Sequence, residues 1–361
     1  MTGTGGSGDE LATFARLEAR LADLSGQIAQ LLVERDPSAF APHVDRVWTQ
    51  MKALEHPYRQ ALAALSQPAV AARVSARNPL AGGQVRQAAR YGGERVRLWP
   101  RVEALLSRVL APHHAPLVTE ASRQVRGRED GAVNNLMRIL AAAANPEADR
   151  QSEAMAGSYA DISLSGAYFL DLCSAAYRVA LAQGRPRPVR FLDIGSGGGS
   201  KLVAASSYFE DVTGLEYNPD YVRRSRHWLD SVGAEDLALI EGDALAFEGY
   251  GDFDVIYFYR PLREPSLQAE MEERVVRQAR PGTIVIAVLT VALHGMDAPV
   301  CARLSNAIFV TGTDAESLSD FRQRAERIGP DVGLHDPTLQ ERAGFWVPIL
   351  DAARRRGFEL R

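Results

Sequence analysis

The second half of the chain alternates short apolar runs with helical stretches, and this pattern constrains the fold more than any other feature. It starts after the breaker at 185–190, and the expected strands are 191–194, 212–216, 237–240, 253–259, 283–290 and, as a further candidate, 306–312. Strands that alternate with helices are joined by right-handed crossovers into a parallel sheet, with the ligand site at their carboxyl ends. We therefore predict an α/β fold, a mostly parallel sheet with helices on both faces.

The first expected strand runs into a glycine turn, Asp193-Ile-Gly-Ser-Gly-Gly-Gly-Ser200. Such glycines let the backbone approach a ligand closely and aim the N–H groups of the next helix at it. In the dinucleotide fingerprint G-x-G-x-x-G the third glycine would fall at position 200, which is Ser. The glycines instead alternate and follow an acidic residue, so the pattern D-x-G-x-G-x-G fits better.

Acidic residues also follow the next two strands. Glu216 lies 23 residues after Asp193, close to the roughly 20-residue interval at which a carboxylate meets a ribose diol. The third strand runs into Glu241-Gly-Asp243. A single Asp after a strand is usually a turn or cap residue, but acids at three successive strand ends predict one crevice.

Over residues 157–290 these motifs resemble the class I S-adenosylmethionine-dependent methyltransferases, which have a Rossmann-like sheet. The resemblance implies S-adenosylmethionine as cofactor, with Asp193 contacting its amino group and Glu216 its ribose. It further implies that Asp243 reads the adenine amino group. The other residues expected to bind the cofactor are Tyr159, Gly195, Ser196, Gly197, Gly199, Tyr217, Ala244 and Leu245.

The end of the fourth strand concerns the methyl acceptor. Many methylators of amino groups on nucleic acid or protein glutamine carry Asp/Asn-Pro-Pro-aromatic here, whereas this chain has Tyr259-Arg260-Pro261. This departure argues against such acceptors. The Tyr259 ring would tolerate the sulfonium, and the Arg260 guanidinium could hold a carboxylate or phosphate of the acceptor.

A hydroxyl acceptor would also need a general base, and His294, after the fifth strand, is the candidate. Tyr259, Arg260 and His294 are thus the predicted catalytic residues. The alternatives are structural: a salt-bridged or solvated Arg260 and a packing His294. No grouping of His or Cys residues indicates a catalytic metal.

The N-terminal part has helical periodicity from Leu11. Its apolar residues recur at spacings of 3, 4, 3, 4 and 3, and they are Phe14, Leu17, Leu21, Leu24, Ile28 and Leu31. This narrow seam is typical of a coiled coil, so it predicts either a homodimer contact or a helix packed on its own domain. Further on, prolines such as Pro42, Pro57 and Pro100 indicate several short helices.

Taken together, these patterns predict a flexible leader over 1–10, an all-helical domain over 11–155 and a methyltransferase domain over 156–361. The helical domain would serve dimerisation, cover the substrate, or both. A last helix is expected over 343–361, within the methyltransferase domain.

Composition narrows the function. The formal net charge is −4, from 41 basic and 45 acidic side chains, which gives no electrostatic case for a nucleic-acid partner. Only Lys52 and Lys201 are lysines, and the strong preference for Arg is typical of a GC-rich genome. Two cysteines form no disulfide framework, and no apolar run approaches the roughly 18 residues of a membrane span. A reduced, cytoplasmic protein without a membrane partner is expected.

Three classes of function remain open. The leading one is a methyltransferase acting on an O or N atom of a small molecule, with a peptide or protein acceptor as the alternative. The second uses the same cofactor for another group transfer, such as aminocarboxypropyl transfer. The third is a non-catalytic scaffold that retains the cofactor fold.

Overall fold

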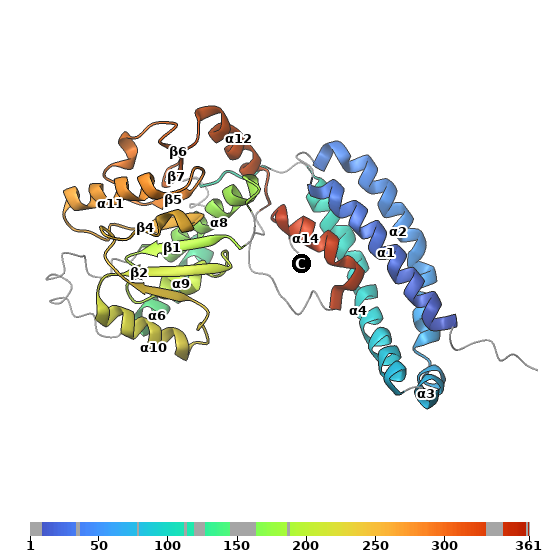
Figure 1. The fold of residues 1–361 in the computed structure, drawn as a ribbon. Coiled ribbons are helices and arrows are strands. Elements are labelled where there is room, and N and C mark those ends of the chain that lie inside the picture. Colours follow the sequence, from blue (N-terminus) through green and yellow to red (C-terminus); the bar gives the residue numbers. More distant parts are fainter. Residues whose placement is uncertain are drawn as a thin grey trace, which may run out of the picture. The chain divides into compact units, whose positions relative to one another are not determined.

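The computed structural model describes residues 9–33, 37–77, 79–111, 114–118, 127–144, 164–185, 188–329, 342–358 and 360. The chain divides into two compact units (Figure 1). One, the helical unit, comprises Met1–His113 and Gly329–Arg361, and the other, the sheet unit, comprises His114–Ile328. Each is described by itself.

The sheet unit contains one seven-stranded sheet in the order β3-β2-β1-β4-β5-β7-β6. Its strands are β1 (Arg190–Ile194), β2 (Asp211–Glu216), β3 (Ala238–Glu241), β4 (Val255–Phe258), β5 (Ile284–Ala287), β6 (Cys301–Ser305) and β7 (Ile308–Thr311). The first five are parallel, and β7 lies antiparallel between β5 and β6. The predicted fold class is therefore confirmed, and β6 is the one strand of this sheet that the sequence pattern did not reveal.

Helices cover both faces of the sheet. On one face, Met271 and Val275 of α11 (Pro265–Gln278) pack with Leu192 and Phe258 in a buried cluster. On the other, the Phe169 ring of α8 (Gly166–Ala182) lies 4.9 Å from that of Tyr257. Strands buried on both faces read as continuous apolar runs, which is why the sequence located them.

The remaining helical elements of the sheet unit connect its strands or precede them. They are α6 (Gly127–Ala144), α9 (Ser200–Ala205), α10 (Pro219–Ser231) and α12 (Ala315–Glu326), with the 3₁₀ turns η1 (Tyr250–Asp252) and η2 (Leu293–Gly295). Because α6 belongs to this unit, the helical unit ends earlier than the expected boundary at 155, which itself lies outside the described residues.

The helical unit is built from fewer and longer helices than the sequence predicted. Four of them come from the N-terminal part: α1 (Asp9–Val33), α2 (Pro37–Leu65), α3 (Pro68–Arg77) and α4 (Pro79–Leu110). The C-terminal segment adds the 3₁₀ turn η3 (Gly344–Trp346) and α14 (Val347–Arg355). Pro42 and Pro57 lie inside α2, and Pro100 lies inside α4. The prediction of short helices was wrong because each proline removes only one backbone hydrogen bond, a loss that burial of a long apolar face offsets.

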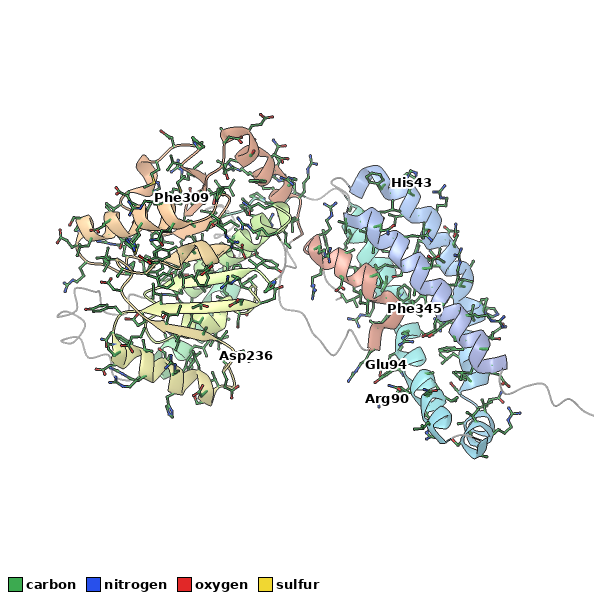
Figure 2. All side chains as sticks on the ribbon, in the orientation of Figure 1. His43, Arg90, Glu94, Asp236, Phe309 and Phe345 are labelled. Carbon is green, nitrogen blue, oxygen red and sulfur yellow. The ribbon has the colours of Figure 1, made fainter. Side chains whose placement is uncertain are left out.

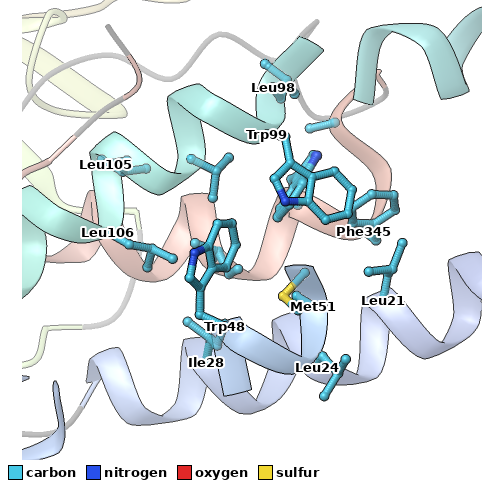
Figure 3. Close-up of a cluster of buried hydrophobic side chains, with 14 of the residues drawn as sticks. Leu21, Leu24, Ile28, Trp48, Met51, Leu98, Trp99, Leu105, Leu106 and Phe345 are labelled. Atoms are coloured by element: carbon cyan, nitrogen blue, oxygen red, sulfur yellow. The ribbon is translucent and has the colours of Figure 1, made fainter. Parts of the chain in front are cut away.

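The seam on α1 is buried within the helical unit. Phe14, Leu21, Leu24 and Ile28 are at most 2% exposed and belong to one large apolar cluster (Figure 3). Leu17 and Leu31 pack against the same cluster. Of the two interpretations of the seam, the structure thus supports packing on the helix's own domain, and the seam no longer predicts a homodimer contact.

The C-terminal segment differs from the predicted domain plan. The sequence placed 343–361 in the methyltransferase domain, but η3 and α14 pack in the helical unit. The Trp346 ring lies 4.8 Å from that of Trp99, and its Nε1 donates to the Arg95 carbonyl at 2.9 Å. The sequence of an amphipathic helix shows that it has an apolar face but not which core that face packs against. The prediction assigned this segment to the domain that precedes it in the chain, and that assignment was wrong.

Candidate functional site

The strand order of the sheet reverses between the neighbouring strands β1 and β4. In open α/β sheets such a switch point holds the ligand at the carboxyl ends of the strands. The loops after the two strands meet there, since a Cβ on Gly195 would lie 2.8 Å from the Pro261 Cβ. Only glycine fits at that position, so the first glycine of the turn sets the close approach of the two loops.

Glycine occupies every second position of the turn for a conformational reason. Gly195, Gly197 and Gly199 have φ values of +77°, +53° and +81°, a region that glycine adopts without steric cost. The amides of Gly195 and Ser196 both donate to the Leu215 carbonyl, at 2.8 and 3.2 Å. The turn is therefore fixed to β2, the strand that carries Glu216.

Glu216 joins the turn to the next helix. Its Oε2 accepts from the Gly197 amide and its Oε1 from the Asn218 amide, both at 2.9 Å. The half-buried carboxylate thus holds the glycine turn and the start of α10 at the end of β2, where the resemblance places the cofactor ribose.

Asp193 is almost fully buried, with 1% of its surface exposed. It lies opposite Gly214 of β2 and Tyr257 of β4 in the sheet register. Burial, and then the charge of Asp193, raise the pKa of the Cys173 thiol on α8 well above its ordinary value. Asp193 therefore has its negative charge on the α8 face of the sheet, at the base of the glycine turn.

Asp243 follows β3 in a tight turn at the same edge of the sheet. Its Oδ1 accepts from the Leu245 amide at 2.8 Å, and Asp243 is exposed. The Tyr250 hydroxyl donates to the Ala244 carbonyl at 2.7 Å and so holds the segment predicted to face adenine. Sequence reasoning missed Tyr250, whose role depends on η1 folding back over this turn.

At the end of β4, Tyr259 and Arg260 are half-buried. Arg260 has φ +46°, one of two positive values among the described non-glycine residues. Lys201 of α9 reaches this place, with its Nζ 5.8 Å from the Tyr257 ring centroid and 6.0 Å from that of Tyr259. Sequence reasoning missed Lys201 because nothing in the pattern shows that α9 passes beside the end of β4.

His294 does not join this group through any contact between described residues. It is exposed on η2, and its ring lies 5.5 Å from that of Phe309 (labelled in Figure 2). Phe309 pairs with Val285 in the middle of β5. The ring therefore packs beside the sheet, and the role of general base stays a prediction without geometric support.

A buried carboxylate that sequence reasoning missed anchors the loop after β5. Glu272 of α11 is fully buried and accepts from the Thr290 hydroxyl and from the amides of Val291, Ala292 and Leu293, the Ala292 bond being 2.7 Å. Beside it, the Gln268 amide donates to Glu272 at 2.8 Å. Glu272 thus fixes one rim of the candidate site.

The other predicted site residues fall in three places. Tyr159 lies outside the described residues, and Tyr217 is 60% exposed. The Ser196 hydroxyl lies against β2, where a Cβ on Gly214 would come within 2.6 Å of it. Among the described residues there is no group of three or more His, Cys, Asp or Glu that could hold a metal, and no helix that could cross a membrane.

Comparison with known proteins finds a similarity for part of the sheet unit. Residues 187–322 match a family model described as "Methyltransferase domain". The matched segment of the sheet unit is thus similar to methyltransferase domains, in agreement with the reaction class predicted from the sequence, and S-adenosylmethionine remains the cofactor expected from the sequence. Curated proteins gave no match.

Similar solved structures include an RNA methyltransferase from Salinibacter ruber, at 19% identity and TM-score 0.29, covering 37% of this chain and 86% of that one. An amino pentose methyltransferase from Micromonospora echinaspora has 25% identity and TM-score 0.27, covering 32% and 49%. A methyltransferase from Thiobacillus denitrificans has 21% identity and TM-score 0.26, covering 33% and 46%. The chain thus spans about half of the last two.

Proposed function

We propose that the protein transfers a methyl group from S-adenosylmethionine to an O or N atom of a small acceptor that bears a carboxylate or phosphate. The observation that carries the proposal is Glu216, whose carboxylate at the end of β2 holds the glycine turn through the Gly197 amide and the start of α10 through the Asn218 amide. Asp193 and Asp243 stand at the ends of the strands on either side of β2.

When bound, the cofactor supplies a methyl group already activated by its sulfonium charge. The remaining task of the protein is to hold donor and acceptor close and aligned, since positioning alone supplies a large part of the rate enhancement in such displacements. Glu216 and the turn of Asp243 would fix the nucleoside part of the cofactor. The glycine turn would hold the amino-acid part beside the end of β4.

Tyr259 and Arg260 are the residues we propose for the acceptor. A non-glycine residue at φ +46° is conformationally strained, and such strain is concentrated at functional sites. The guanidinium would bind a carboxylate or phosphate with charge-assisted hydrogen bonds. The net charge of −4 and the Tyr-Arg-Pro sequence favour a small anionic acceptor over nucleic acid.

Ligand binding by the whole chain tests the cofactor part of the proposal. Saturating S-adenosylmethionine or S-adenosylhomocysteine should raise the melting temperature, because a ligand that binds only the folded state stabilises it. Glu216→Ala should weaken binding about tenfold or more, while Glu241→Ala, the exposed residue that pairs with it on β3, should leave it unchanged. Stabilisation by NADH alone would contradict the proposal.

Mass spectrometry tests the transfer itself. Incubation with cofactor and mixtures of anionic metabolites should give a product heavier by one methyl group, and Arg260→Ala should reduce its yield more than cofactor affinity. If peptides added in place of the metabolites are methylated, the acceptor is a peptide or protein and not a small molecule. A product heavier by an aminocarboxypropyl group would replace methyl transfer with that reaction.

A further inference from the structure

Lys201 stands at the candidate site with its charge near two aromatic rings. It is the second residue of α9, directly after the glycine turn, and its side chain is half-buried. The ammonium lies 5.8 Å from the Tyr257 ring centroid and 6.0 Å from that of Tyr259. Distances of about 6 Å allow a cation–π attraction, and Tyr257 and Tyr259 lie in and directly after β4, so the ammonium lies beside the end of this strand.

The two lysines of this chain have different surroundings. Lys52, in the helical unit, forms an ion pair with Glu103. Around Lys201, no carboxylate of the described residues lies within ion-pairing distance of the ammonium. The attraction of two tyrosine faces compensates a half-buried positive charge less well than an anion does. The position of Lys201 therefore suits an anionic ligand group.

The bound cofactor would itself make an anion necessary at this place. Its sulfonium is positive, and a lysine ammonium nearby would repel it unless a negative group lies between or beside them. The amino-acid part of the cofactor, which the glycine turn holds in this family, ends in an α-carboxylate. That carboxylate has the negative charge that suits Lys201, and Lys201 follows the glycine turn in the chain.

We propose that Lys201 binds the α-carboxylate of the cofactor and makes the site select cofactors that carry this carboxylate. The inference rests on the proposed function, because it presupposes that S-adenosylmethionine binds at the switch point. Tyr257 and Tyr259 act through Lys201 as positioning residues, since their faces confine the ammonium. The acceptor anion remains assigned to Arg260.

A structural role is the competing explanation. Asp193 pairs in register with Tyr257, so Lys201 could serve as a counter-charge to the buried Asp193 carboxylate across the Tyr257 ring. In that case its removal would lower the stability of the sheet unit and weaken every ligand to the same extent. The two explanations therefore differ in whether removal of Lys201 weakens only the ligand that carries the carboxylate or every ligand equally.

The test is a titration of the full chain with two ligands that differ only in the carboxylate, S-adenosylmethionine and decarboxylated S-adenosylmethionine. The wild type should bind the first about tenfold more tightly, the size expected of a charge-assisted hydrogen bond. Lys201→Met keeps the length of the side chain but removes the charge. It should weaken S-adenosylmethionine binding about tenfold and should not weaken binding of the decarboxylated ligand, whose positive charge Lys201 no longer repels.

Two further variants complete the design. Lys52→Met removes the only other lysine and should change neither affinity. Lys201→Arg keeps the charge and should keep the preference for the ligand that carries the carboxylate. If Lys201→Met does not fold, the ratio of the two affinities is measured in Lys201→Arg instead. Equal loss of both ligands, or no loss of either, in Lys201→Met would overturn the inference. A wild type that binds neither ligand would instead overturn the proposed function.

Discussion

The helical unit and the sheet unit use their polar groups in opposite ways. In the helical unit the buried Tyr58 hydroxyl donates to Glu18 at 2.7 Å, and Arg95 forms an ion pair with the same carboxylate. This network lies within the helical core and is satisfied by its own members. In the sheet unit, Glu216 holds the backbone amides of Gly197 and Asn218, in the loops that follow β1 and β2. The polar network of the helical unit therefore stabilises its core, whereas Glu216 of the sheet unit positions backbone at the candidate site.

Helices of both units begin at proline. In the helical unit α2, α3 and α4 start at Pro37, Pro68 and Pro79, and proline suits the first helical position because that N–H has no helical partner. In the sheet unit α10 and α11 also start at proline, at Pro219 and Pro265, and α10 has the Asn218 side-chain cap in addition. Proline in this chain therefore marks a helix start more often than the sequence interpretation assumed.

The largest expected effect separates the units by stability. Trp346→Ala should destabilise the helical unit by about 3–5 kcal/mol, the usual cost of truncating a buried tryptophan, because Trp346 is fully buried against Trp99. Denaturant unfolding followed by tryptophan fluorescence measures it, since Trp48, Trp99 and Trp346 lie in this unit and only Trp228 in the other.

The control for this change is Leu80→Ala, at a side chain that is 81% exposed. It should stay within about 0.5 kcal/mol of the wild type. Cofactor-induced stabilisation of the sheet unit should survive Trp346→Ala. If cofactor binding is lost together with the helical core, the two units are energetically coupled and the comparison above fails.

The next effect concerns the glycine turn. Gly195→Ala should destabilise the sheet unit by about 2–4 kcal/mol, because alanine at φ +77° is strained and its Cβ would lie 2.8 Å from Pro261. Gly233→Ala is the matched control, with φ +72° but nothing within 4 Å of the new Cβ. It should cost only the strain, about 1–2 kcal/mol. Equal unfolding free energies for the two variants would show that the contact with Pro261 does not contribute to the cost of Gly195→Ala.

How much the sequence could predict depended on whether the deciding contacts are local. Strands β1, β2 and β4 were located from apolar runs, and the turn after β1 from its glycines, because these signals come from neighbouring residues. Strand β6 was missed because Arg303 and Ser305 interrupt its short apolar run. The partner of α14 and the place of Lys201 depend on contacts between distant segments, so no local pattern contained them.

The candidate site shows the same division. The acids Asp193, Glu216 and Asp243 were predicted at strand ends and lie there in the structure, although their ligand roles remain predictions. Glu272 could not be found from the sequence, because its function is to accept from a loop about 20 residues further along the chain. His294 was chosen for its place in the sequence, and η2 turns it toward Phe309 instead.

A smaller effect is expected at Glu272. Glu272→Gln keeps the shape of the side chain but presents an NH2 group to the amides of Val291 and Ala292, which then lack one acceptor. Loss of buried hydrogen bonds to a carboxylate should cost about 2 kcal/mol. Hydrogen exchange of the amides at 291–293 should accelerate, while S-adenosylmethionine affinity should not change. Unaltered exchange would show that Glu272 does not anchor this rim.

The smallest effect is expected at the cap of α12, and it depends on pH. Asp314 accepts from the Ser317 amide at 2.8 Å, and this hydrogen bond lowers the pKa of the Asp314 carboxyl below its ordinary value of 3.8. A carboxyl with a lowered folded-state pKa binds fewer protons in the folded chain, so it contributes stability above its unfolded pKa and loses it as pH falls through the folded value. Asp314→Ala should therefore lower the melting temperature slightly at pH 7, and the difference from the wild type should shrink below about pH 4. Asp314→Asn retains a capping side chain without the titration, so its difference from the wild type should be smaller still. A difference for Asp314→Ala that stays constant down to pH 2 would show that the cap does not depend on the ionised carboxylate.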